Sequence, residues 1–428
     1  MWVRFLISSL IALYTTLWPA ALVEARDFTA AAPIIDISPL LHSSDLDPDN
    51  FHTQHLISRT TGAIVEAFRD YGVFIATGLT AGEIDDIHFD IVSDSSFQSA
   101  LQLFDLPMLS KVAVQLNMST DPTNTNSSFG RGFLKFGAEA GLSEYFEPKE
   151  GFSYGYQLPH NQSRNMLNQP NIWPDGFSPE PLDDMYLALT SVVERLLLAL
   201  NQSQHLQAAM PSPVDLIEYT AYGHTISLMR LFHYFAVDSL QDQLVNIERH
   251  TVIGSSPHTD WGMLTLIAQN DVTGLQFLHK EKWVTIPYIE HSVVFNCGDY
   301  FSLLTGGYFI SPIHRVLAPQ QRDRLSFVYF FYPNYESPLH LPTPTRGDDV
   351  TGGSDAKKIR FNTLLAKEQS PGAIRNESGD DHHVLSEAST RDIPGSATSS
   401  GSDAESDSVI CFGEYIVSKW RGVFKKNY

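Results

Sequence analysis

Two histidines and one aspartate are spaced so that they can bind the same metal ion. His258 and Asp260 lie two residues apart, and alternate residues of a β-strand project to the same face. His314 begins a later strand-like run, which can close back onto the first in a barrel. Three protein ligands leave three positions of an octahedral ion open for oxygen and an organic co-ligand, which suits ferrous iron. Zinc remains a competitor, because it also binds histidine and aspartate.

Arg324 and Ser326 share one face of the next strand-like run, which continues to Tyr332. A guanidinium inside a barrel needs an anion, because an unpaired buried charge is strongly destabilising. A carboxylate fits it best, and the serine hydroxyl adds a donor. A hydrolytic zinc site has no need of this second anion, whereas a dicarboxylic 2-oxo acid can chelate iron at one end and meet Arg324 at the other. The alternative for Arg324 is a salt bridge to a nearby Asp or Glu.

Tyr234 lies on an earlier strand-like run and can donate its hydroxyl to the same carboxylate. The alternative is an ordinary core tyrosine. The phenylalanines that are candidates for an apolar substrate pocket, or for ordinary core packing, are Phe133, Phe136, Phe330 and Phe331.

The elements that must position these residues follow from apolar periodicity. Spacings of three and four predict helices over 56–70 and 181–200, and β-rich runs at 33–37 and 72–76 flank the first helix. From about residue 217 the pattern changes to short strands between glycine-containing turns, at 228–234, 264–268, 275–278, 283–286, 293–296 and 325–332. Many short strands at this spacing predict a sandwich or a barrel.

The composition excludes several classes of protein. A hydrophobic content of 43% in 428 residues allows a sizeable core and argues against global disorder. The net charge of −21 argues against DNA or RNA as the main partner. Two cysteines exclude a disulfide scaffold and a cysteine-rich metal site, whereas 16 histidines leave a nitrogen-ligated metal open.

Residues 1–25 resemble a secretory signal peptide, with Arg4 before a mostly apolar run over 5–22 and small residues after it. The run is just long enough to be an uncleaved membrane anchor, and an unusual N-terminus is a third alternative. Five Asn-x-Ser sequons agree with a glycoprotein on a secretory route but also arise by chance: Asn117, Asn126, Asn161, Asn201 and Asn376. We therefore expect a protein of the secretory pathway or a secreted one, with the cytoplasm as the alternative.

The C-terminal region changes character twice. Residues 367–408 are rich in Ser, Gly, Asp and Glu and predict a disordered acidic insertion. Residues 409–428 predict a final helix, whose basic residues suit the negative end of the helix dipole. Cys297 and Cys411 can pair in an oxidising compartment, but the apolar run around Cys297 favours a buried free thiol.

Taken together, these motifs make the sequence resemble the isopenicillin-N-synthase-like family of Fe(II)/2-oxoglutarate-dependent dioxygenases over residues 33–340. A second, shorter segment of resemblance covers residues 409–420. The most specific string is His-Thr-Asp-Trp-Gly-Met-Leu-Thr-Leu at 258–266. The strings at 296–299, 305–307 and 314–316 follow in the family's order, and those at 33–36, 71–74, 131–133 and 149–152 resemble its N-terminal domain. Three features depart from the family: Phe-His-Tyr-Phe at 232–235 replaces Asn-Tyr-Tyr-Pro, and residues 1–25 and 367–408 have no counterpart.

The resemblance implies an α+β fold with a double-stranded β-helix (jelly-roll) core, flanking helices and an N-terminal α/β region. It implies an N-terminal dioxygenase domain over 30–165 and a catalytic domain, with its leading helix, over 180–345. The residues that match the iron ligands are His258, Asp260 and His314, and those that match the 2-oxoglutarate site are Arg324, Ser326 and Tyr234.

The implied activity is the oxidation of a small organic molecule by dioxygen, as hydroxylation, desaturation or cyclisation, with release of succinate and carbon dioxide. Ascorbate is a further reductant to consider. The alternatives are an Fe(II) oxidase of the same fold that does not use 2-oxoglutarate and a ligand-binding relative without turnover. We expect a monomer that has no nucleic-acid partner and touches a membrane only if its N-terminal segment is an uncleaved anchor.

Overall fold

The computed structural model describes most of the chain between residues 32 and 424. The described ranges are 32–41, 51–116, 130–138, 144–158, 165–210, 215–221, 225–240, 251–338 and 411–424. The predictions made for residues 1–25, for residues 367–408 and for the sequons at Asn117, Asn126, Asn161 and Asn376 fall outside these ranges.

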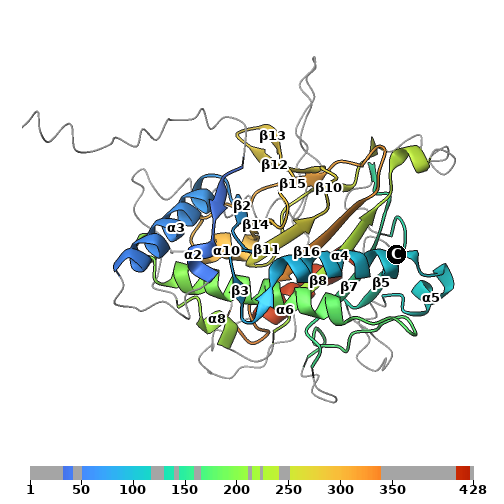
Figure 1. Cartoon of the computed structure of the whole chain (residues 1–428), viewed down its shortest axis with the longest axis horizontal. Helices are drawn as coiled ribbons and strands as arrows, with labels where there is room; N and C mark the ends of the chain where they lie inside the picture. Colours follow the sequence, from blue (N-terminus) through green and yellow to red (C-terminus); the bar gives the residue numbers. More distant parts are fainter. Residues whose placement is uncertain are drawn as a thin grey trace, which may run out of the picture.

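An eight-stranded sheet forms the largest element of the fold (Figure 1). Its strand order is β1-β2-β14-β11-β16-β8-β7-β5, and all neighbours are antiparallel except β1 and β2. The strands are β1 (Ile34–Asp36), β2 (Val73–Thr77), β5 (Gly132–Leu134), β7 (Lys149–Gly155), β8 (Leu228–Tyr234), β11 (Leu264–Gln269), β14 (Val293–Cys297) and β16 (Arg324–Phe331).

A four-stranded sheet in the order β10-β15-β12-β13 completes the jelly roll. Its strands are β10 (Ser255–His258), β12 (Leu275–His279), β13 (Lys282–Thr285) and β15 (His314–Val316). Two small ribbons pair β3 (Glu83–Ile84) with β4 (Ile87–His88), and β6 (Tyr145–Phe146) with β9 (Thr251–Val252). The predicted jelly-roll fold with flanking helices is therefore confirmed.

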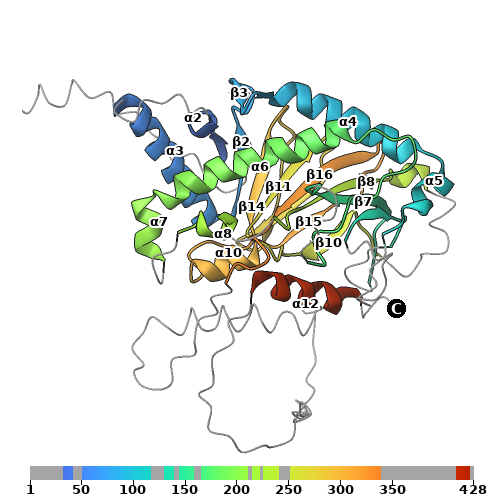
Figure 2. The same ribbon diagram turned by 90° about the horizontal axis from the view of Figure 1, so that it is seen from below.

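Helices cover the large sheet on one face, where α4 and α6 lie along the strands, while α12 lies on the other side of the molecule (Figure 2). The helices are α2 (Ser38–Leu41), α3 (Phe51–Asp70), α4 (Phe89–Asp105), α5 (Met108–Ala113), α6 (Glu180–Asn201), α7 (Gln204–Ala209), α8 (Glu218–Ala221), α10 (Asp299–Leu304) and α12 (Phe412–Phe424), with a 3₁₀ turn, η2, at Val237–Ser239. No helix in these ranges combines the length and apolarity needed to cross a membrane.

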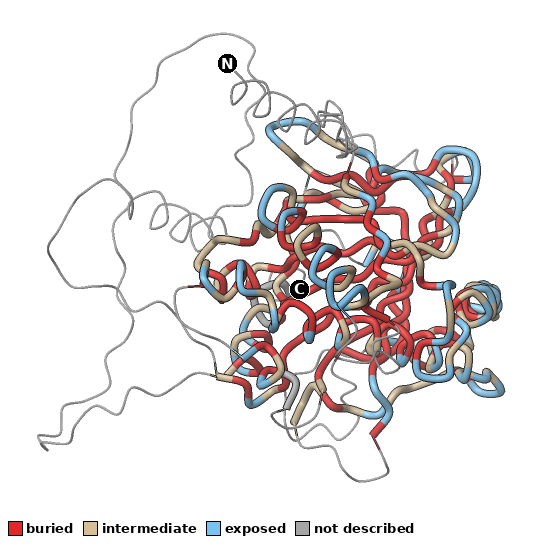
Figure 3. The backbone as a smooth tube through the Cα atoms, turned by 60° about the vertical axis from the view of Figure 1, so that its left-hand side comes forward, coloured by how far each residue is buried: buried red, intermediate tan, exposed pale blue. Residues whose placement is uncertain are grey.

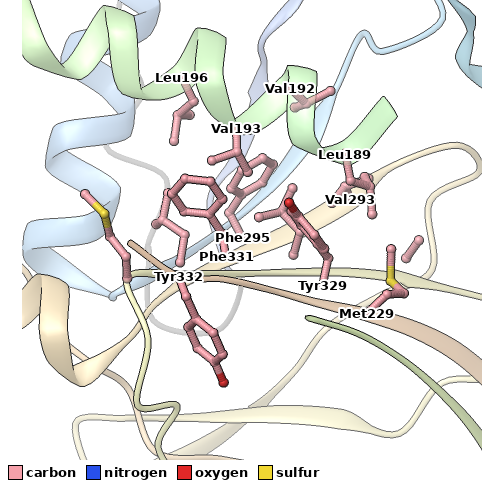
Figure 4. Packing of buried hydrophobic residues seen from close by; sticks show 14 of the residues in the cluster. Leu189, Val192, Val193, Leu196, Met229, Val293, Phe295, Tyr329, Phe331 and Tyr332 are labelled. Atoms are coloured by element: carbon pink, nitrogen blue, oxygen red, sulfur yellow. The ribbon is translucent and has the colours of Figure 1, made fainter. Parts of the chain in front are cut away.

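Helix α6 supplies much of the core, as its apolar spacing predicts. Its buried face includes Leu189, Val193 and Leu196, which point at Phe295 and other aromatic side chains of the sheet (Figure 4). Each such side chain contributes about 1.5–3 kcal/mol when fully buried. The helix begins one residue before the predicted start and ends one residue after the predicted end. The buried residues gather in the interior of the molecule, and the exposed ones lie mainly at its periphery (Figure 3).

The sheet separates two environments, because alternate residues point to opposite faces. Tyr329 and Phe331 of β16 pack towards α6, whereas the ring of Tyr332 points away from that helix (Figure 4). The opposite face of the same strand carries Arg324 and Ser326, which are both 1% exposed. The large sheet is thus apolar on its helix side and carries chemical groups on its inner side.

The two cysteines are free thiols, Cys297 buried and Cys411 partly exposed. Burial raises the pKa of Cys297 well above its ordinary value. The prediction of a buried free thiol at Cys297 is confirmed, and the alternative of a disulfide with Cys411 is wrong.

His233, which lies within the Phe-His-Tyr-Phe departure from the family pattern, joins three parts of the fold. Its Nδ1 lies 3.0 Å from Oε1 of Glu150 on β7, and its Nε2 lies 2.9 Å from Oδ2 of Asp323, just before β16. Lys111 of α5 donates to the other oxygen of Glu150 at 2.9 Å. Burial lowers the pKa of His233, but the hydrogen bonds to Glu150 and Asp323 outweigh it, so the pKa lies above its ordinary value.

Because the folded state binds this proton more tightly than the unfolded chain, protonated His233 stabilises the fold at low pH. We predict that His233→Gln lowers the free energy of unfolding by about 1–3 kcal/mol below pH ~6.5, the ordinary pKa of histidine. The difference from wild type should shrink as pH rises through the raised pKa. Urea unfolding between pH ~5.5 and ~9 measures it, with His88→Gln, a half-exposed histidine beside Glu83, as the control. A pH-independent difference would contradict the assignment.

Candidate active site

Three potential metal ligands converge between the two sheets. His258 ends β10, His314 begins β15, and these two residues are paired in the ladder between the strands. Oδ1 of Asp260 lies 3.8 Å from Nε2 of His258 and 3.7 Å from Nε2 of His314. All three ligand atoms lie within 4.8 Å of one another, and no other group of three or more His, Cys, Asp and Glu side chains in the described ranges is so arranged.

The predicted reason for this convergence is only partly right. His258 and Asp260 were expected to share one face of a strand, but β10 ends at His258. Asp260 lies in the irregular segment that follows, before β11 begins. This segment, rather than strand alternation, carries its carboxylate to the two imidazoles. The predicted strand start at His314 is correct.

Hydrogen bonds fix the orientation of all three side chains. Nδ1 of His258 lies 2.7 Å from the carbonyl oxygen of Ser256, and Nδ1 of His314 lies 3.2 Å from that of Pro312. A carbonyl only accepts, so each Nδ1 carries the proton and each Nε2 presents its lone pair to a metal. Asn296 of β14 donates to Oδ2 of Asp260 at 2.8 Å, which leaves Oδ1 towards the histidines.

The protonation states suit a metal site as well. Burial lowers the pKa of His314 to about 4, against the attraction of Asp260. Burial alone would raise the pKa of Asp260, but His314, His258 and Asn296 outweigh it and hold the pKa below its ordinary value. Near neutral pH the buried pair therefore consists of a neutral imidazole and an ionised carboxylate, the forms that bind metal.

Asp299, at the start of α10, ties together the two segments that carry the ligands. Its carboxylate accepts from Thr259 at 3.1 Å and from Ser311 at 2.6 Å. Its backbone N–H donates to the carbonyl oxygen of Asp260 at 2.7 Å. Sequence reasoning placed this residue within a family string but gave it no role. Its partners come from two segments far apart in the chain, and only the fold shows them together.

Arg324 lies at the other end of the site with neutral partners. Its guanidinium donates to Oε1 of Gln269 at 2.9 Å and to Oγ of Ser326 at 3.2 Å, and it stacks over the ring of Tyr234 at 4.9 Å from the centroid. Its Nε has no hydrogen-bond partner. No carboxylate of the described part of the chain forms an ion pair with it, so the alternative of a local salt bridge is wrong for these residues. Burial lowers its pKa.

A cavity of about 250 Å³ joins the triad to Arg324. Alternate residues of β16 and β8 line it, together with β10, β15 and one side chain of α12. The lining residues to which the sequence analysis gave no role include Glu147, Lys149, Arg230, Phe232, Trp261, Tyr332 and Trp420. Of the four phenylalanines considered for a substrate pocket, Phe330 lines the cavity. The alternative of ordinary core packing is confirmed for Phe133 and Phe331, which are buried in the core. Phe136 packs on Phe146 and Phe235 and is not among the residues that line the cavity.

Comparison with known families agrees with this geometry. The model of the 2OG-Fe(II) oxygenase superfamily matches residues 226–333. The model of the N-terminal region of non-haem dioxygenases in morphine synthesis matches residues 32–176. The two matched ranges contain every residue of the triad and of the Arg324 end of the cavity.

Curated relatives match over most of their length. Homoarginine-6-hydroxylase 2-ODD-C23.2 of Arabidopsis thaliana is 27% identical over 318 residues, which cover 73% of this chain and 80% of the relative. The 2-oxoglutarate-dependent dioxygenase tropC of Talaromyces stipitatus is 27% identical over 351 residues, which cover 78% of this chain and 94% of the relative.

Solved structures agree on the fold. A full-length Neurospora crassa protein in complex with alpha-KG superposes with a TM-score of 0.55 at 20% identity, over 78% of this chain and 97% of that one. A putative 2OG-Fe(II) oxygenase family protein from Caulobacter crescentus superposes with a TM-score of 0.54 at 21% identity, over 78% and 100%.

The fold and the convergent site define a non-haem iron dioxygenase. The chain belongs to the 2OG-Fe(II) oxygenase superfamily, as its resemblance to the isopenicillin-N-synthase-like family predicted. It is an Fe(II)/2-oxoglutarate-dependent dioxygenase that oxidises a small organic molecule. Its cofactor is Fe(II) rather than zinc, and 2-oxoglutarate is its co-substrate.

Proposed function

We propose that His258, Asp260 and His314 hold the ferrous ion of this dioxygenase. The proposal is supported by the convergence of two lone-pair nitrogens and one ionised carboxylate oxygen within 4.8 Å. Two imidazoles and one carboxylate form the donor set of non-haem Fe(II) oxygenases. When bound, iron and 2-oxoglutarate supply the oxidising power for the substrate, and the protein supplies binding, orientation and exclusion of water.

We propose that Arg324, Ser326 and Tyr234 bind the distal carboxylate of 2-oxoglutarate. This assignment is supported by the burial of Arg324, which is only 1% exposed. Its guanidinium donates hydrogen bonds to the neutral amide of Gln269 and the hydroxyl of Ser326. Such a buried cation is unfavourable until an anion enters. A carboxylate can accept from the guanidinium and from the Ser326 hydroxyl, and the ring of Tyr234 already stacks on the guanidinium.

The residues around the site then determine its chemistry. Asn296 and the two backbone carbonyls hold the triad in one orientation. Apolar side chains such as Ile267, Leu275, Val316 and Val328 line the cavity between the triad and Arg324 and keep water out. We propose that the substrate is oxidised by hydroxylation, desaturation or cyclisation, with release of succinate and carbon dioxide.

Replacing Arg324 tests the 2-oxoglutarate assignment. We predict that Arg324→Lys raises the 2-oxoglutarate concentration needed for half-maximal succinate formation at least tenfold, because a point charge replaces a two-pronged donor. Arg322→Lys is the matched control. Arg322 lies two residues before Arg324, and its exposed side chain forms an ion pair with Asp271. Succinate formation and oxygen uptake are measured with and without 2-oxoglutarate.

An unchanged requirement in Arg324→Lys would place the anchor elsewhere. Oxygen uptake without 2-oxoglutarate would favour the oxidase alternative for this chain. Complete absence of turnover, with 2-oxoglutarate still bound, would favour the ligand-binding alternative.

We further propose that the protein is a monomeric glycoprotein of the secretory pathway. The resemblance of residues 1–25 to a secretory signal peptide supports the secretory pathway, and the cytoplasm is the alternative location. Asn201 is a poor glycan acceptor in the folded chain, because its side-chain amide donates to Asp215 and accepts from the backbone of Leu216. Any glycans are therefore expected at the other four sequons.

Expression of the full chain in a eukaryotic secretory host tests the route. We predict an N-terminus near residue 26 and a loss of mass on glycosidase treatment that Asn201→Gln does not alter. A retained residue 1 in a membrane fraction would favour the anchor, and a retained residue 1 in soluble, glycan-free protein would favour the cytoplasm.

A further inference from the structure

The strand that ends at His258 contains a bulge. In the ladder between β10 and β15, Ser255 pairs with Val316 and His258 pairs with His314, so the register shifts between the two pairs. An extra residue on one strand bends it and re-aims the side chains nearby. Pro257 lies within this stretch, on an edge strand of the small sheet, and both positions suit a residue without a backbone N–H. The direction of His258 therefore depends on what stabilises the bulge.

A buried carboxylate from another part of the chain binds the bulge. Oε1 of Glu147, between β6 and β7, accepts from the backbone N–H of Ser256 at 2.8 Å. Nζ of Lys149 lies 2.7 Å from Oε2 of Glu147 and donates to Oγ of Ser255 at 3.3 Å. Burial alone would raise the pKa of Glu147, but Lys149 and Ser256 outweigh it and hold the pKa below its ordinary value. The acceptor is thus an ionised carboxylate, which forms a stronger hydrogen bond than a neutral group.

The backbone of Ser256 also orients the histidine. Its carbonyl oxygen lies 2.7 Å from Nδ1 of His258. The side chain of His258 is 43% exposed, whereas that of His314 is 5% exposed. Packing therefore constrains His258 less than His314, and the hydrogen bond to Ser256 matters more for its direction. A continuous set of hydrogen bonds runs from Glu147, through the backbone of Ser256, to the imidazole.

We propose that Glu147 is a positioning residue, which fixes the bulge at Ser256 and thereby aims Nε2 of His258 at the metal. The inference rests on the proposed function, since it assumes that His258 is a ligand. Without an acceptor at position 147, the N–H of Ser256 would be buried and unpaired, which is unfavourable. The bulge would then turn towards water and carry the imidazole out of line.

Calorimetric titration of the metal-free full chain with Co(II) tests this role in two matched variants. Glu147→Gln/Lys149→Met removes both charges but keeps an acceptor oxygen for Ser256. Glu147→Met/Lys149→Met removes both charges and the acceptor. We expect the first variant to bind Co(II) within about threefold of wild type. The second should bind at least about tenfold more weakly, because it alone leaves the N–H of Ser256 unpaired.

The chain offers a control in a second buried lysine–glutamate pair. Nζ of Lys111 lies 2.9 Å from Oε2 of Glu150, and the two side chains are 7% and 2% exposed. Glu150 otherwise bonds to His233 rather than to β10. Glu150→Met/Lys111→Met should therefore leave the Co(II) affinity within about twofold of wild type. A tenfold loss in this control as well would show a general effect of neutralising buried pairs and would overturn the positioning role.

Hydrogen exchange of the Ser256 amide in metal-free wild type needs no variant. We expect this amide to be strongly protected before any metal binds, because Glu147 already accepts from it. Fast exchange there, or equal Co(II) affinity of the two Glu147 variants, would overturn the proposal. Failure of wild type to bind Co(II), or an unchanged affinity in His258→Ala, would instead contradict the proposed function, so the two failures can be told apart.

Discussion

A buried positive charge with neutral protein partners is the constraint on which the site depends. Arg324 is buried from water, and its guanidinium donates hydrogen bonds to the neutral side chains of Gln269 and Ser326. Its positive charge therefore needs an anion as a counter-charge. At the other end of the same cavity, one carboxylate faces two imidazoles. A ligand that is both a metal chelator and a distant carboxylate satisfies both ends at once, and 2-oxoglutarate is such a ligand.

The jelly roll explains how a small number of strands can position both ends of the cavity, the His-Asp-His triad and Arg324. Strand alternation on β16 points Arg324 and Ser326 inward while Phe327 and Tyr329 pack against the helices. The small sheet contributes the two histidines from adjacent strands. Asp299 then joins the segments next to them, so the three candidate ligands are positioned by hydrogen bonds between loops as well as by the strand pairing.

The sequence predicted the parts of this arrangement that local pattern determines. Period-two alternation placed Arg324 and Ser326 on one face, and apolar spacing placed α6 almost to the residue. Asp260 was expected on a strand because strand alternation was assumed beyond His258, where the strand in fact ends.

The remaining parts depend on contacts between distant segments. Trp420 reaches the cavity from a helix that follows residues 339–410, and no local pattern reveals such a contact. Arg230 was predicted to lie on a strand, but its position beside Trp420 needed the fold. The same applies to Phe133 and Phe331, since hydrophobicity alone does not distinguish the core side of a sheet from its cavity side.

The most direct measurement of the central claim is a crystal structure of the full chain grown under nitrogen with Fe(II) and 2-oxoglutarate, with anomalous data at the iron edge. We predict one iron peak bonded to Nε2 of His258, Nε2 of His314 and the carboxylate of Asp260. We also predict the distal carboxylate of 2-oxoglutarate on Arg324 and Ser326. Iron bound elsewhere, or an Arg324 that remains without a carboxylate while 2-oxoglutarate is bound, would contradict this assignment.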